Sequence, residues 1–144
     1  MIDLHAHVVL ENSLGACGAH GPELHEGNPE CGELPYFRVG DYVLHGVKYR
    51  GSAFMDLDLR LAALNELGIE LQVLSPNPLT YFSGVDTQSA TQFAQTHNDA
   101  LAALVAHAPG RLAGLAQLPT QDPAMAVVEL HRAVKELGLL GAYI

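Results

Sequence analysis

The chain has 144 residues, and 49% of them are hydrophobic, so a single domain of ordinary size can bury a substantial core. The formal net charge of −9, the seven scattered basic residues and the lack of tryptophan argue against nucleic acid as a partner. No apolar run approaches the roughly 20 residues of a membrane span and no signal peptide is evident, so the sequence predicts no membrane association and a soluble, cytoplasmic protein.

The first ten residues combine strand alternation with side chains that bind metals. Apolar and polar residues alternate strictly from Ile2 to His7, which predicts a strand with Asp3, His5 and His7 on one face. Side chains two positions apart on a strand lie about 6 to 7 Å apart, so two imidazoles can converge on one metal ion. The flanking apolar residues predict a buried strand, whose polar side chains need partners such as a metal. The alternative is a pair of exposed or hydrogen-bonded histidines on an edge strand.

Residues 11–33 are rich in glycine, proline and polar side chains and predict a long loop. A connection of this length inside a domain is usually functional or mobile. Its four metal-binding side chains match no common structural zinc pattern, which favours free thiols and solvated imidazoles over a second site: Cys17, His20, His25 and Cys31. A disulfide between the two cysteines is disfavoured by the cytoplasmic assignment.

Residues 36–50 predict a small antiparallel insertion. Short runs of β-forming residues at 36–39, 41–44 and 47–50 are separated by Gly40 and Gly46, which favours two or three strands.

Strands and helices alternate through the rest of the chain. The sequence predicts helices at 56–67, 86–107 and 122–137, and strands at 69–75, 111–119 and 139–144. Such alternation requires a parallel sheet with right-handed crossovers. His97 lies on the apolar stripe of the second helix, where a packed, hydrogen-bonded core histidine is favoured over a metal ligand.

The opening Ile2-Asp3-Leu4-His5-Ala6-His7 resembles the start of the amidohydrolase superfamily. More specifically, it resembles the decarboxylase branch of the amidohydrolase 2 type, typified by aminocarboxymuconate semialdehyde decarboxylase. The resemblance extends to the Leu-Pro-x-Gln-Asp-Pro turn and the Glu-Leu-Gly-x-x-Gly ending within residues 111–144. It implies an α/β fold, namely strands one to four of a metal-dependent hydrolase (β/α)8 TIM barrel, with a loop and β insertion at about 11–50. Since such a barrel takes about 250 residues, residues 1–144 are expected to form its N-terminal half.

The resemblance also implies the site residues. His5 and His7 would bind a divalent metal, with zinc the first choice and manganese the alternative. Arg50, or Lys48 within two positions, matches an arginine that reaches the substrate carboxylate, which a planar guanidinium holds with two parallel hydrogen bonds. A solvated strand arginine is the alternative. In the family the remaining ligands and the general acid or base come from later strands, so no catalytic residue is assigned within these 144 residues.

The implied activity is that of a metal-dependent carboxy-lyase, a decarboxylase, acting on a small unsaturated or aromatic carboxylic acid. One alternative is a hydrolase or hydratase of the same superfamily, because fold does not fix function. The other is a non-catalytic metal-binding or interaction half-barrel. The expected partner is the small carboxylated substrate. Uncovered sheet edges further predict a homo-oligomer or completion by the missing C-terminal half.

Overall fold

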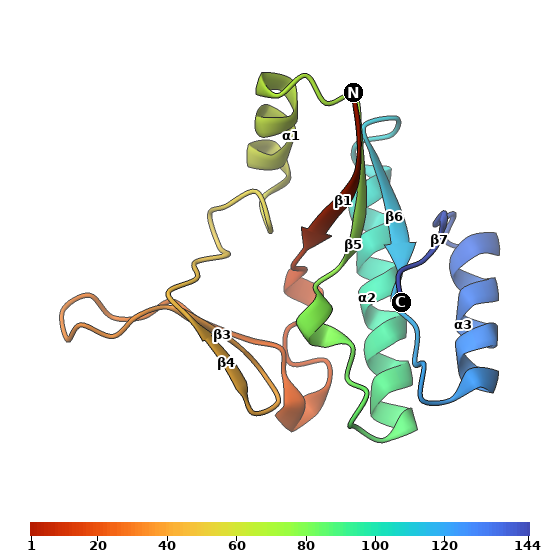
Figure 1. Cartoon of the computed structure of the whole chain (residues 1–144), viewed down its shortest axis with the longest axis horizontal. Coiled ribbons are helices and arrows are strands. Elements are labelled where there is room, and N and C mark those ends of the chain that lie inside the picture. The colour runs from red at the N-terminus through yellow and green to blue at the C-terminus, as the bar shows by residue number, and fades with distance from the viewer.

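The computed structural model describes every residue from Met1 to Ile144 and contains a four-stranded and a three-stranded sheet (Figure 1). The larger sheet comprises β1 (Ile2–Val8), β5 (Leu71–Pro76), β6 (Leu112–Ala116) and β7 (Gly141–Ala142). All its strand pairs are parallel, and their order in space follows their order in the chain. This is the arrangement of consecutive strands in a (β/α)8 barrel, as the sequence predicts.

Three α-helices accompany these strands. They are α1 (Leu57–Glu66), α2 (Thr87–Ala106) and α3 (Pro123–Lys135). Each begins directly after an aspartate, Asp56, Asp86 or Asp122, whose carboxylate accepts a hydrogen bond from a backbone N–H of the first turn at 2.9 to 3.0 Å. Such caps typically contribute about 1 kcal/mol each, which explains why the predicted helix starts are confirmed. None of the helices combines the length and apolar character that crossing a membrane requires.

The main core lies between the parallel sheet and its helices. In Figure 1, α2 runs behind β5 and β6 with α3 beside it, and α2 packs against β6 and α3. The contact between α2 and β6 is very close at Gly114, where a Cβ atom would lie 3.0 Å from the Leu101 side chain and 2.9 Å from that of Leu139. The small residues of β6 therefore serve the close approach that the sequence predicts.

The predicted insertion forms the second sheet, but with a different third strand. It comprises β2 (Glu23–His25), β3 (Tyr36–Val39) and β4 (Tyr42–His45), paired antiparallel in that order. The third strand comes from the predicted loop, because Glu23 pairs with Arg38 across β2 and β3, and residues 47–50 form no strand. Residues 11–33 also contain two 3-10 helices, Glu11–Ser13 and Gly18–His20, so this segment is not a structureless loop.

The two edge strands of the parallel sheet differ from the sequence prediction. The prediction that β1 is buried is wrong for its first half, since Ile2 is 58% and Leu4 is 70% exposed. β1 is an edge strand, and in Figure 1 α2 runs behind β5 and β6 and leaves β1 at the free edge of the sheet. At the other edge, only Gly141 and Ala142 of the predicted strand 139–144 have strand geometry, although Tyr143 N still donates to Ala116 O at 3.1 Å.

His97 is a buried core residue, as predicted, but without the predicted hydrogen bonds. It is 2% exposed, and its ring stacks on that of Phe93 with centroids 5.9 Å apart. Both ring nitrogens are buried without a hydrogen-bond partner. Burial therefore lowers the pKa of His97 to about 4, because the charged imidazolium has no compensating contact.

This burial predicts a loss of stability on mild acidification. Between the unfolded pKa near 6.5 and the folded pKa of about 4, the unfolded chain binds the extra proton, so stability falls as the pH falls. From pH 7 to pH 5 we expect His97 to account for a loss of about 2 kcal/mol. Urea unfolding at both values should show a smaller loss for His97→Phe than for the parent. An equal loss in the two proteins would contradict the assignment.

Candidate metal centre

A β-bulge divides β1 into two parts with opposite alternation. Asp3 pairs with Gln72 and Ala6 with Leu74, so three steps along β1 match only two along β5. The extra residue reverses the relation between position and face. Asp3 and Ala6 consequently lie on the face that carries Leu74 and packs against the helices, while His7 lies on the other, inner face.

Asp3 makes its hydrogen bonds on this helix-facing side of the sheet, and its side chain does not lie on the face of the two histidines. Its Oδ1 accepts the His5 backbone N–H at 3.0 Å, and its Oδ2 accepts from Gln72 Nε2 at 2.7 Å. These hydrogen bonds, that of Gln72 first, hold the pKa of Asp3 below its ordinary value. The Gln72 amide oxygen accepts from Arg60, which also donates to His7 O at 3.0 Å. The prediction that Asp3 shares a face with the two histidines is therefore wrong, because the bulge intervenes.

The His7 ring is oriented by contacts to one of its nitrogens. Its Nδ1 lies 3.0 Å from Pro76 O and 2.9 Å from Ser75 Oγ, and Ser75 Oγ donates to Ala6 O at 3.2 Å. A carbonyl oxygen can only accept, so we assign the proton to Nδ1. The lone pair is then on Nε2, which is the state of a metal-binding imidazole fixed by a backbone carbonyl.

His5 lies beside His7, with ring centroids 4.9 Å apart and an interplanar angle of 78°. Two adjacent imidazoles, one with an oriented free nitrogen, fit a divalent metal. The chain groups no three histidine, cysteine, aspartate or glutamate side chains in a metal-binding arrangement, so this pair supplies two ligands. Catalytic zinc sites usually have three protein ligands, and the pair alone is thus a partial site.

The structure does not group the four side chains considered for a second metal site, which are Cys17, His20, His25 and Cys31. Cys17 is a buried free thiol and Cys31 an exposed one. His25 instead stacks on Tyr36, with centroids 4.8 Å apart.

Arg50 is engaged by carboxylates of this chain. Its Nε donates to Glu11 Oε2 at 3.2 Å and its Nη2 donates to Glu11 Oε1, which makes a bidentate pair, and Nη1 lies 3.6 Å from Glu26 Oε1. Arg50 and Lys48 also line an open polar pocket. None of the hydrogen bonds or ion pairs of Arg50 reaches His5 or His7, so the structure does not bring the three predicted site residues into contact.

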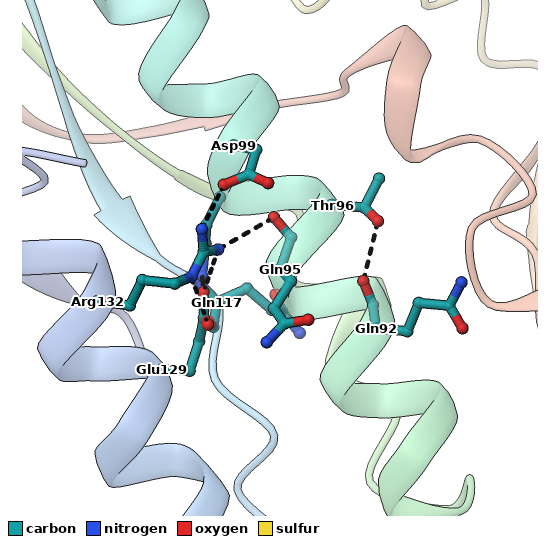
Figure 2. Close-up of polar contacts among 8 residues, drawn as sticks. Gln92, Gln95, Thr96, Asp99, Gln117, Glu129 and Arg132 are labelled. Atoms are coloured by element: carbon teal, nitrogen blue, oxygen red, sulfur yellow. Dashed lines mark hydrogen bonds and ion pairs between the residues drawn. The ribbon is translucent and has the colours of Figure 1, made fainter. Parts of the chain in front are cut away.

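A buried polar network that was not predicted from the sequence fixes the segment after β6 (Figure 2). Asn98 Nδ2 donates to Gln117 O at 2.9 Å and to Glu129 Oε1 at 2.7 Å, while Asn98 Oδ1 accepts from Gln117 N at 2.8 Å. Glu129 also accepts two hydrogen bonds from Arg132 on the same helix. The Gln117 side chain donates to Thr80 O at 2.7 Å, so one network links α2, α3 and the segments that follow β5 and β6.

The fold is that of an α/β protein of the barrel type, and the histidine pair lies on the first strand of its parallel sheet. Residues 2–144 match the family model described as amidohydrolase. The chain belongs to the amidohydrolase family.

Curated relatives of the chain are decarboxylases. It is 43% identical over 94 residues to gamma-resorcylate decarboxylase of Polaromonas sp., covering 65% of this chain and 29% of that one. It is 38% identical over 89 residues to 2-amino-3-carboxymuconate-6-semialdehyde decarboxylase of Dictyostelium discoideum, covering 62% and 25%. The chain thus spans less than a third of the length of these relatives.

Solved structures confirm the fold over nearly the whole chain. Dihydroxybenzoic acid decarboxylase from Polaromonas sp., with bound manganese and the inhibitor 2-nitroresorcinol, superimposes with a TM-score of 0.69 at 34% identity, covering 98% of this chain and 36% of that one. For 5-carboxyvanillate decarboxylase from Sphingomonas paucimobilis, the TM-score is 0.70 at 25% identity, covering 99% and 41%. The predicted class, part of an amidohydrolase TIM barrel with a small antiparallel sheet, is confirmed.

Proposed function

We propose that the protein to which this chain belongs is a metal-dependent decarboxylase of a small carboxylic acid, and that the chain supplies the first two metal ligands. The observation that carries the proposal is the His7 ring, whose Nδ1 is fixed by Pro76 O so that Nε2 is free beside His5. The relatives' decarboxylase activity supports the reaction type. Because the chain spans a minor part of these relatives, the activity, the substrate and the partners remain proposals for the whole protein.

His5 and His7 are the residues that would hold the ion. The metal is divalent in this proposal, since a related decarboxylase structure holds manganese. Zinc, the first choice from imidazole chemistry, stays a prediction, and manganese is favoured by the relative. When bound, such an ion stabilises negative charge that develops on substrate oxygens.

Arg50 is proposed to hold the substrate carboxylate. Its bidentate contact with Glu11 supports this role, because two parallel hydrogen bonds are the geometry in which a guanidinium would hold a substrate carboxylate. Both side chains are substantially exposed, at 41% for Arg50 and 62% for Glu11, so water screens the attraction between them. A substrate carboxylate can therefore displace Glu11 at little cost.

The test uses protein expressed from the full reading frame that contains this sequence, with Mn²⁺ and 2,6-dihydroxybenzoate. We expect carbon dioxide release that stops on chelation. Arg50→Lys should raise KM about tenfold with a smaller change in kcat, because one of two parallel hydrogen bonds is lost while the charge stays. Release of a hydrolysis or hydration product would favour the hydrolase or hydratase alternative. Absence of turnover with metal bound would contradict the enzymatic proposal.

Association with further protein is also proposed, either in a homo-oligomer or by completion with a C-terminal half. The exposed apolar residues Ile2 and Leu4 on the edge strand β1 support it. Two free thiols support a reducing compartment, for which we propose the cytoplasm.

A further inference from the structure

Two tyrosines that the sequence analysis did not single out adjoin the histidine pair. The Tyr143 ring centroid lies 5.9 Å from that of His5 and 6.0 Å from that of His7, edge to face with both. Tyr81 lies on the far side of Tyr143, nearly parallel to it at 27° with centroids 6.3 Å apart. Tyr143 follows β7 directly and Tyr81 follows β5, so the aromatic groups converge from three strands at the carboxyl ends of the sheet.

The Tyr81 hydroxyl has no partner within the chain. Its oxygen is buried and makes no hydrogen bond. Burial first, and the neighbouring Tyr143 second, raise the pKa of Tyr81 to about 12, so the phenol keeps its proton at neutral pH. A buried donor without an acceptor is unfavourable, and the Tyr81→Phe substitution would remove this cost.

We propose that Tyr143 determines substrate specificity, with its ring selecting planar aromatic acids over open-chain unsaturated acids and Tyr81 stacking on that ring to hold it in place. The inference deepens the proposed function and rests on it. Aromatic rings attract one another in offset or edge-to-face contact beyond the effect of buried area, and an open-chain acid gains less from this. A small acid held beside His5 and His7 would adjoin the Tyr143 ring.

The experiment compares two singly charged acids of known chemistry, 2,6-dihydroxybenzoate and the open-chain diene acid sorbate. Each is titrated calorimetrically, with and without Mn²⁺, into protein expressed from the full reading frame that contains this sequence. We expect the parent to bind the aromatic acid about five- to tenfold more tightly than sorbate. Tyr143→Phe should keep this ratio because the ring remains, whereas Tyr143→Leu should bring it close to one. Tyr81→Phe should leave the ratio unchanged, because the phenyl ring still stacks on Tyr143.

An unchanged ratio in Tyr143→Leu would overturn the inference, and so would failure of both acids to bind the folded parent. Thermal unfolding identifies a variant that has lost its fold. If Tyr143→Leu is unfolded, Tyr143→Phe serves as the test instead. A lower affinity ratio of the two acids in Tyr143→Phe would also contradict the role of the ring. Failure of the proposed function is recognised separately, as absence of bound Mn²⁺ or of carbon dioxide release. The titrations without metal test the role of the tyrosines independently of the proposed function.

Discussion

Alanine at His7 is expected to abolish stoichiometric binding of Mn²⁺ or Zn²⁺ by the folded chain, and alanine at His5 is expected to do the same. Two imidazoles are the only ligands that this chain groups at the site, so each variant leaves a single ligand. One imidazole does not hold a divalent ion against water at micromolar concentrations. Ser75→Ala should weaken binding by only about tenfold, because the ring keeps its hydrogen bond to Pro76 O while losing that to the hydroxyl.

Equilibrium dialysis followed by elemental analysis measures these effects, with circular dichroism to verify the fold. His25→Ala is the matched control, since its ring stacks on Tyr36 in the insertion and should leave metal content unchanged. Full metal content in either the His5 or the His7 variant would exclude the pair as the metal centre. No bound metal in the parent would mean that this part of the barrel cannot form the site alone.

Glu129→Ala is expected to destabilise the fold by about 3 kcal/mol. The side chain is 1% exposed, and its carboxylate accepts from Asn98 and twice from Arg132. Truncation leaves the Asn98 amide with an unpaired buried donor and removes the ion pair that keeps the pKa of Arg132 raised. Such a loss is larger than that of a surface ion pair, because water cannot replace the missing acceptor.

Asp99→Asn supplies the matched comparison. Asp99 also pairs with Arg132, with Oδ1 2.6 Å from Nη1, but its side chain is 58% exposed (Figure 2). Its replacement should cost no more than about 1 kcal/mol. Urea unfolding of the two variants would separate the buried from the exposed partner of the same guanidinium. Equal losses would mean that the buried network contributes no more than a surface contact.

The sequence predicts the regular elements well because their signals are local. Aspartate caps precede each helix, and glycines mark the turns, so the boundaries of α1 and α2 are predicted to within about one residue. The third strand of the insertion could not be predicted, since Glu23–His25 is short and is held by pairing with β3. Pairing between segments distant in sequence leaves no periodic pattern in either one.

The candidate site was predictable only in part. His5 and His7 are signalled by their spacing on a strand, and they do lie side by side. Tyr143 and Asn98 carry no such signal, because a single tyrosine after a strand or a single asparagine on a helix has many uses. Their roles depend on neighbours from other elements, which only the folded chain supplies. The face on which Asp3 lies was predicted wrongly, because the alternation of apolar and polar residues does not reveal a β-bulge.

The bulge in β1 also bears on how the strand tolerates changes in length. Leu4 lies between Asp3 and His5 and is 70% exposed, so deleting it would remove the surplus residue and leave a regular strand. Asp3 would keep its place opposite Gln72, and both histidines would keep theirs on the inner face. Deleting Ala6 instead would make the two histidines adjacent and send their rings to opposite sides. In an alignment of related chains, a gap at Leu4 would therefore be structurally neutral, whereas a gap at Ala6 would mark loss of the metal ligands.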